Sequence, residues 1–202
     1  MLIQRSHERG FSLVELLVGI SIFSILIAMA APSFTSWVQN AQLRTAAESI
    51  SAGLQLARAE AVRRNTNVMF QLTDSMDAAC NLSLNGPNWV VSLNDTTALC
   101  HIAPSADTAA PVVPSIIQKH SGTDGTPNAR INAGVSVVTY GGLGRVNGIN
   151  APVIIRVTNP APMGGDCRDA GGPMRCLNII VSPGGQSRMC DPAIAAPNPQ
   201  GC

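Results

Sequence analysis

The chain has 202 residues, of which 12% are charged and 3% are aromatic, and it contains 18 glycines and 14 prolines. This composition favours a turn-rich β structure over a helical bundle, and the roughly 170 residues beyond an N-terminal apolar segment suffice for one globular domain. Of the 13 basic and 12 acidic residues, Arg5, Arg9 and Glu8 precede residue 11, so the remaining chain is neutral, which excludes nucleic-acid binding driven by bulk charge.

A continuous apolar segment lies near the N-terminus. From Phe11 to Ala31 the only ionisable residue is Glu15. As a helix this segment would be about 32 Å long, which is enough to cross the hydrocarbon core of a bilayer. A carboxylate inside a membrane helix costs about 3 kcal/mol, so a solitary one predicts a functional partner. We therefore expect a transmembrane helix over residues 11–31 in which Glu15 has a specific role.

The residues before this segment differ from a secretory signal peptide, in which the apolar region precedes the cleavage site. Here a polar leader with Arg5 and Arg9 ends at Gly10, and the apolar segment follows. The sequence Gly-Phe-Ser-Leu-Val-Glu, from Gly10 to Glu15, resembles the class III leader junction of type IV pilins and type II secretion pseudopilins. The resemblance implies that residues 1–10 are removed by a prepilin peptidase, which then methylates the amine of Phe11.

The same resemblance implies an orientation and a role for Glu15. The arginines of the leader would hold the N-terminus in the cytoplasm, so that the residues after the span lie in the periplasm. Glu15 would meet the Phe11 ammonium of a neighbouring subunit during docking into a filament, where unlike charges attract strongly. The alternative is a carboxylate that only reaches the head groups. Small residues of the segment would let helices approach closely: Gly19, Ser21 and Ser24.

The helical pattern continues beyond the apolar segment to about Arg64. Apolar residues recur at three- and four-residue steps and form a narrow, alanine-rich stripe: Leu43, Ala46 or Ala47, Ile50, Leu54, Ala57 and Ala61. Pro32 removes one intrahelical hydrogen bond and predicts a kink. We expect an amphipathic continuation of the helix over residues 32–66 that packs its stripe against a sheet.

From residue 67 the pattern changes to short β-branched runs separated by turn residues. Six runs predict strands: 68–72, 88–93, 115–119, 135–140, 153–158 and 177–181. The segments 99–114 and 161–173 have the composition of loops. A long helix followed by strands predicts an α+β fold with an antiparallel sheet, rather than alternating βαβ units.

All six cysteines lie beyond the apolar segment. An even number in an exported segment indicates disulfides formed in an oxidising periplasm, although six cysteines allow fifteen pairings and the sequence does not select one. Local closure favours three short-range bridges, each worth about 2–4 kcal/mol: Cys80 with Cys100, Cys167 with Cys176, and Cys190 with Cys202. No Cys-x-x-Cys pair occurs, so a zinc site is not expected.

Three further stretches follow one another in the chain. A Trp strand runs into Asp over 88–95, an aromatic strand precedes a glycine-rich turn over 138–145, and a final hairpin over 179–190 ends in Arg-Met-Cys. In this order they resemble the strand motifs of the GspH/FimT branch of pilin-like proteins. The resemblance implies a type IV pilin-like fold, in which a helix that is half transmembrane and half amphipathic packs on a disulfide-stapled β domain over 67–202.

The sequence contains no pattern typical of catalysis. His101 and His120 stand in loop-like sequence without a catalytic or metal-ligand motif, and we expect both on the surface. The glycines of 141–144 follow a strand but do not precede a helix, which indicates a hairpin turn rather than a nucleotide site. Trp89 is expected in the core. We therefore predict that the protein is not an enzyme and needs no metal, cofactor or small-molecule substrate.

Arginines near the C-terminus raise the question of DNA binding. Some FimT-like pilins are DNA receptors that use a C-terminal Gly-Arg-x-Arg hairpin, but here Gln186 stands where the first arginine would be. Few phosphate contacts would make binding weak and sensitive to salt, and solvated surface arginines are the alternative. Four arginines are the candidates for DNA contact: Arg145, Arg156, Arg175 and Arg188.

Together these features favour a minor pilin or pseudopilin whose function is assembly. The leading interpretation is a structural subunit of the tip or priming complex of a type IV pilus. The alternatives are a GspH-type pseudopilin that acts in type II protein export and a pilus-borne DNA receptor for natural transformation. The expected partners are other major and minor pilins, the prepilin peptidase and the bacterial inner membrane. The protein would span that membrane once, with its C-terminal domain periplasmic, before it joins a pilus or pseudopilus.

Overall fold

The structure is a computed structural model, and it describes residues 11–105, 113–162, 164–195 and 197–202, without the side chains of residues 30–33. The predicted leader over 1–10, and the Pro32 side chain on which the predicted kink depends, lie outside this described part. The chain divides between Trp37 and Val38 into two compact units. Helix α1 (Leu13–Arg64) begins in the first unit and ends in the second.

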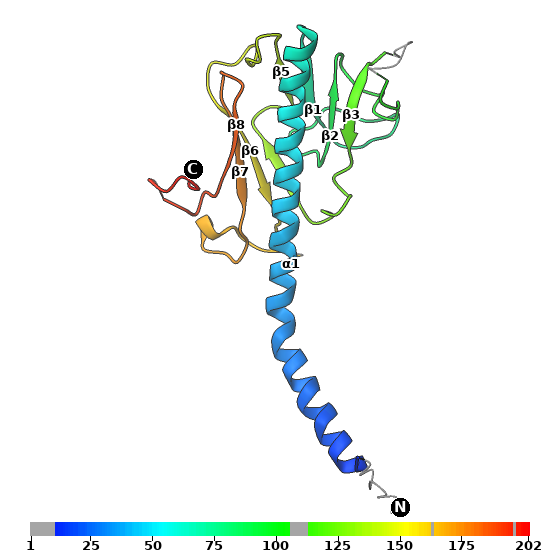
Figure 1. The fold of residues 1–202 in the computed structure, drawn as a ribbon, viewed down its shortest axis with the longest axis vertical. Coiled ribbons are helices and arrows are strands. Elements are labelled where there is room, and N and C mark those ends of the chain that lie inside the picture. The colour runs from blue at the N-terminus through cyan, green and yellow to red at the C-terminus, as the bar shows by residue number, and fades with distance from the viewer. Residues whose placement is uncertain (1–10, 106–112, 163, 196) are drawn as a thin grey trace, which may run out of the picture. The chain divides into compact units, whose positions relative to one another are not determined.

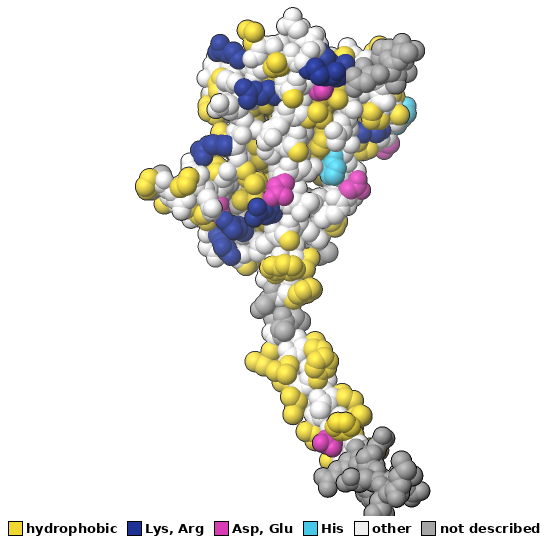
Figure 2. All heavy atoms as spheres, viewed as in Figure 1, with side chains coloured by type: hydrophobic (Ala, Val, Ile, Leu, Met, Phe, Trp, Pro, Cys, Tyr) yellow, Lys and Arg dark blue, Asp and Glu magenta, His cyan; other side chains and the backbone are white. Residues whose placement is uncertain are grey.

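In the first unit the large apolar side chains of α1 face outward. Between Leu13 and Met29 they are 53% to 75% exposed, and hydrophobic side chains cover most of the surface of this segment that is visible in Figure 2. Among the described residues no single helix meets the criteria of length and hydropathy for crossing a membrane, whereas Leu13–Met29 and Phe34–Arg64 meet them when they are taken together.

In the second unit α1 buries one stripe. The residues at or near zero exposure are those that the periodicity predicts, so the amphipathic helix is confirmed: Leu43, Ala46, Ala47, Ile50, Leu54, Ala57 and Ala61. The helix ends at Arg64, and Asn65 follows with a positive φ of 49°. Asparagine tolerates this left-handed conformation better than most residues, which explains the stop at that position.

The strands form two four-stranded sheets in which every pairing of neighbouring strands is antiparallel. The first sheet has the order β3-β2-β1-β5, from β1 (Val68–Thr73), β2 (Asn88–Ser92), β3 (Ile116–His120) and β5 (Val137–Tyr140). The second has the order β4-β6-β7-β8, from β4 (Arg130–Ala133), β6 (Val153–Thr158), β7 (Leu177–Val181) and β8 (Ser187–Cys190). In Figure 1, β1–β3 lie to the right of α1 and β6–β8 to its left.

One core joins the stripe of α1 to both sheets. Ile155, Val157 and Ile179 of the second sheet are fully buried, as are Val68 and Tyr140 of the first. The buried positions alternate with more exposed ones along β6 and β7, as expected for strands that have one face in the core. The structure therefore confirms the α+β fold with a long helix on antiparallel β structure, and it divides the predicted sheet into two.

Gly53 brings α1 close to the first sheet. A Cβ atom at this position would lie 2.8 Å from a ring carbon of Phe70 and 3.1 Å from the ring of Trp89. Both rings are almost completely buried, and their centroids are 5.8 Å apart in a stacked arrangement. The missing side chain therefore makes room for an aromatic pair between helix and sheet.

A polar cluster ties β1 to the loop after β2. The Gln71 side chain is fully buried, and its amide nitrogen donates to Ser92 Oγ at 2.7 Å and to the carbonyl oxygen of Asn94 at 2.9 Å. Its amide oxygen accepts from the backbone nitrogen of Thr96 at 3.1 Å and from its hydroxyl at 3.2 Å. These four hydrogen bonds satisfy the side-chain amide of Gln71, which would be costly to bury without partners.

Three disulfides link the cysteines in the pairs that local closure favoured: Cys80–Cys100, Cys167–Cys176 and Cys190–Cys202. Each closes a segment of the second unit. Cys80 and Cys100 are fully buried, and the backbone nitrogen of Ala98 donates to the carbonyl oxygen of Cys80 at 2.8 Å. This bridge thus holds the loop that also supplies Thr96 to the Gln71 cluster.

Several predicted elements need correction. All six predicted strands occur, and the predicted final hairpin over 179–190 is confirmed as β7 and β8. β4 was not predicted, and a short 3-10 helix (Arg168–Ala170) lies within the predicted loop of 161–173. His120 is not a loop residue, because it ends β3 and its ring stacks on Trp89 with centroids 5.6 Å apart. The predicted hairpin turn is confirmed, since the backbone nitrogen of Gly141 donates to the carbonyl oxygen of Arg145 and Tyr140 pairs with Val146.

Candidate functional site

The start of α1 is built around Ser12 and Glu15. The backbone nitrogen of Glu15 donates to Ser12 Oγ at 3.1 Å, and that of Leu16 donates to the carbonyl oxygen of Ser12 at 3.2 Å. Ser12 is thus the N-cap, and Glu15 occupies the third helical position, where a negative charge interacts favourably with the helix dipole. The sequence signal for this arrangement is Ser-x-x-Glu before an apolar run.

The carboxylate of Glu15 is exposed and forms no ion pair with any side chain that the structure describes. Phe11, which precedes the helix, is 84% exposed. Gly10, the other half of the predicted cleavage site, lies outside the described residues. The carboxylate and the residue that is expected to carry the new N-terminus are therefore both exposed.

Small polar residues of the apolar segment satisfy their hydroxyl groups within the helix. Ser21 Oγ donates to the carbonyl oxygen of Leu17 and Ser24 Oγ to that of Ile20, both at 2.8 Å. A Cβ atom at Gly19 would have no neighbour within 4 Å. These residues need no polar partner outside the helix, and they leave room for another helix to approach.

A second feature is an open groove of about 570 Å³ between α1 and the β7–β8 hairpin. Gln55 and Arg58 line it from the helix, and Ser182, Gln186 and Arg188 are among the residues that line it from the hairpin. Arg58 Nε donates to the carbonyl oxygen of Gly144 at 3.1 Å, and Arg188 Nη1 donates to that of Gly201 at 3.3 Å. Neither guanidinium pairs with a described carboxylate, so this groove has a positive lining.

The four arginines considered for DNA contact do not form one basic surface. Arg156 pairs with Asp169 at 2.6 Å and Arg175 pairs with Asp191 at 2.8 Å, so two of the four charges are compensated. Arg145 lines a different groove from that of Arg188. On the face seen in Figure 2, Lys and Arg side chains are scattered rather than merged into a patch. This arrangement provides few phosphate contacts for a nucleic acid.

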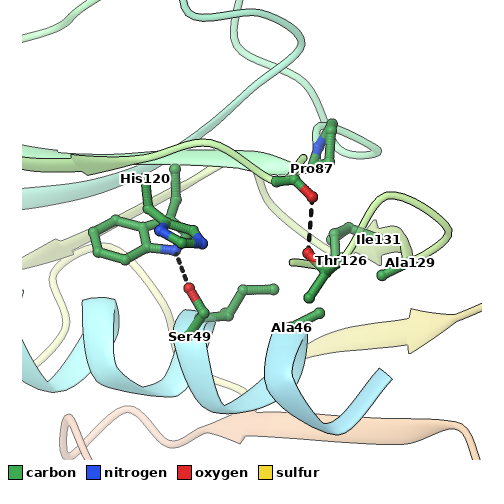
Figure 3. A pocket seen from close by; sticks show the side chains of 10 residues that line it. Ala46, Ser49, Pro87, His120, Thr126, Ala129 and Ile131 are labelled. Atoms are coloured by element: carbon green, nitrogen blue, oxygen red, sulfur yellow. Dashed lines mark hydrogen bonds between the residues drawn. The ribbon is translucent and has the colours of Figure 1, made fainter. Parts of the chain in front are cut away.

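The small cavity beneath Trp89 belongs to the core. Its volume is about 10 Å³, which is the size of a single water molecule and too small for a substrate. Trp89 Nε1 donates to Ser49 Oγ at 3.0 Å, and His120 covers the indole ring (Figure 3). Trp89 is 3% exposed, which confirms the prediction of a core residue. No group of three or more metal-ligating side chains occurs in the part of the chain that the structure describes.

Comparisons with known proteins match two segments of the chain to family models. The family model described as type II transport protein GspH matches residues 46–185, and the prokaryotic N-terminal methylation motif matches residues 5–31. No curated protein sequence matches the chain.

Two solved structures resemble the fold. Both are crystal structures of the type IV minor pilin FimU of Pseudomonas aeruginosa, in space groups P65 and P21, and both are 18% identical in sequence to this chain. The first has a TM-score of 0.47 and covers 77% of this chain and 97% of its own, and the second has a TM-score of 0.49 and covers 80% and 97%.

The two family matches are consistent with the capped apolar helix and with the two-sheet domain described above. The GspH match alone extends over more than half of the chain, and the methylation motif spans the junction at which Gly10 meets Phe11. The chain therefore belongs to the GspH family and is a minor pilin or pseudopilin.

Proposed function

We propose that this subunit is anchored in the inner membrane by residues 11–31, after removal of residues 1–10, and that it joins a filament through Glu15. The observation that carries the proposal is an exposed, unpaired carboxylate in an apolar helical segment whose large side chains are more than half exposed. Such a surface is stable only when lipid or other helices cover it.

In the filament the partner of Glu15 is the methylated amine of Phe11 in an adjacent subunit. In a low-dielectric layer an unpaired carboxylate and an unpaired ammonium are each costly, and the cost falls when they meet. The pair therefore sets the register of the new subunit relative to its neighbour. Close approach of the helices is favoured by the small side chains at Gly19, Ser21 and Ser24.

This proposal assigns a role to each segment of the chain. Residues 1–10 are the leader, 11–31 span the membrane, 32–66 continue the helix, and 67–202 form the periplasmic domain with its disulfides. The leader arginines orient the span with its N-terminus in the cytoplasm. The partners are other major and minor pilins and the prepilin peptidase, and the domain contacts them at the tip or within the filament.

The proposed system is a type IV pilus, in whose tip or priming complex the protein is a structural subunit. A second candidate is the type II secretion pseudopilus, because the family that matches 46–185 is described as a type II transport protein. Deletion distinguishes the two. Loss of twitching with intact export of secreted proteins supports the pilus, and loss of export with intact twitching supports the secretion system.

Glu15→Ala tests the assembly step. The variant should be cleaved and remain in the membrane, but its content in sheared filaments should fall by roughly a hundredfold if a charge pair worth about 3 kcal/mol is lost. Glu48→Ala is the matched control, since it removes an exposed carboxylate from the same helix, in an ion pair with Arg44. Equal amounts of Glu15→Ala and wild-type protein in filaments would disprove the proposed docking role.

A further inference from the structure

The end of the apolar segment carries an exposed aromatic pair. Phe34 is 64% exposed and Trp37 is 67% exposed, and their ring centroids are 6.0 Å apart. The two rings lie one helical turn apart on α1, in the last residues of the first unit. No described residue accepts a hydrogen bond from the indole nitrogen of Trp37, so this pair combines apolar rings with one free polar group.

The charged residues alone do not define where the membrane span ends on its periplasmic side. No charged residue occurs between Glu15 and Arg44, a stretch that as a helix is about 40 Å long and exceeds the hydrocarbon core of about 30 Å. Measured from Glu15 along a helix, Phe34 lies about 28 Å away and Trp37 about 33 Å away. The carboxylate and the aromatic pair are therefore separated by one hydrocarbon thickness.

Aromatic rings with one polar end concentrate at the level of the lipid head groups, where the ring is in an apolar medium and its donor meets water or ester oxygens. We propose that Phe34 and Trp37 form a membrane-interface anchor that lies among the head groups of the outer leaflet of the inner membrane. The anchor fixes the depth of α1, and it thereby holds Glu15 at the opposite interface. This inference rests on the proposed membrane span of residues 11–31.

The test uses the full chain, reconstituted into vesicles of phosphatidylethanolamine and phosphatidylglycerol. The chain has two tryptophans, and Trp89 is 3% exposed in the core of the β-rich unit. The difference in emission between wild-type protein and Trp37→Phe therefore isolates Trp37. Lipids that carry bromine near the head group and lipids that carry it near the acyl end then report the depth of the indole. An unchanged far-ultraviolet spectrum of Trp37→Phe shows that the fold is intact.

We expect a larger fractional loss of Trp37 emission with bromine near the head group than with bromine near the acyl end, at all protein-to-lipid ratios. Stronger quenching by the deep bromine, or no quenching in vesicle-bound protein, would overturn the anchor while leaving the span intact. Quenching that disappears as the protein density rises would show that a second copy, not lipid, covers the pair, and would also overturn it. Protein that fails to float with the vesicles would overturn both the span and the anchor.

Discussion

Tyr140 is the only tyrosine of the chain, and its side chain is fully buried in β5. Burial raises the pKa of the Tyr140 hydroxyl to about 12, and the nearby positive charge of Arg58 opposes this effect. No described residue hydrogen-bonds to the hydroxyl. Because the folded state keeps the proton above the usual pKa of 10.0, the free energy of unfolding falls as the pH rises from 10 towards 12.

This pKa can be measured without interference from any other tyrosine. The tyrosinate absorbance of the native protein should stay low at pH 10 and reach half of its maximum only near pH 12, whereas the urea-unfolded chain should be half ionised near pH 10. Tyr140→Phe should be at least as stable as the wild type, since the hydroxyl has no partner to lose. Half ionisation near pH 10, with a native circular dichroism spectrum, would show that the hydroxyl is not buried.

At the same scale, the residues that we propose for the assembly site can be identified from sequence, because the pattern that marks them is local. Glu15 is conspicuous as one charge in an apolar run, and its place in the first helical turn follows from Ser12 three residues earlier. Which arginines form ion pairs could not be predicted in this way. Arg156 pairs with Asp169, 13 residues away, and Arg175 pairs with Asp191, 16 residues away. Only folding brings these segments together.

At the scale of the element, α1 follows directly from periodicity. Apolar residues at three- and four-residue steps share one face only when the segment is helical. Two strands, β4 and β8, are absent from the β-branched runs of the sequence, and both are four residues long. β4 has the sequence Arg-Ile-Asn-Ala and β8 has Ser-Arg-Met-Cys, so each has at most one β-branched residue. Both are edge strands, and the neighbouring strand rather than their own propensity makes them extended.

The contact between α1 and the first sheet predicts an unusual result for Gly53→Ala. Alanine favours a helix by about 1 kcal/mol over glycine, but the new Cβ atom would overlap the buried rings of Phe70 and Trp89, at a cost of about 1–3 kcal/mol. We expect a net destabilisation of about 1 kcal/mol, with a melting temperature that is lower by about 2–4 °C.

Ala59→Gly is the matched control for that measurement. Ala59 is exposed on the same helix, so the substitution should cost only the helix propensity, about 1 kcal/mol. Thermal unfolding of the detergent-solubilised proteins, followed by circular dichroism, compares the two variants. A melting temperature of Gly53→Ala above that of the wild type would mean that the helix does not approach the aromatic pair as closely as described.

At the scale of the whole molecule, composition and element order predicted the α+β class, but not the split into two sheets. That split depends on pairings between distant segments, such as β1 with β5 and β4 with β6. Sequence patterns describe which face of a strand is buried, and they contain no information on which strand lies beside it. The disulfides were easier to predict, because each bridge closes a short segment.

The three bridges should differ in their resistance to reduction. Cys202 is exposed, whereas Cys80 and Cys100 are fully buried. A thiolate must reach a sulfur atom to exchange with it, so the Cys190–Cys202 bridge should open first in native protein, and the Cys80–Cys100 bridge should open only with unfolding. Alkylation after partial reduction, followed by mass spectrometry of the peptides, measures the order. Labelling of Cys80 as fast as that of Cys202 would contradict the buried position of that bridge.

The proposed assembly depends on the conversion of this chain into a mature subunit with a new N-terminus near Glu15. The most direct test is mass spectrometry of the N-terminal peptide of the protein purified from its native membrane. We expect a peptide that begins at Phe11 and carries one additional methyl group on its amine. A peptide that still contains residues 1–10, with an unmodified Phe11, would contradict it.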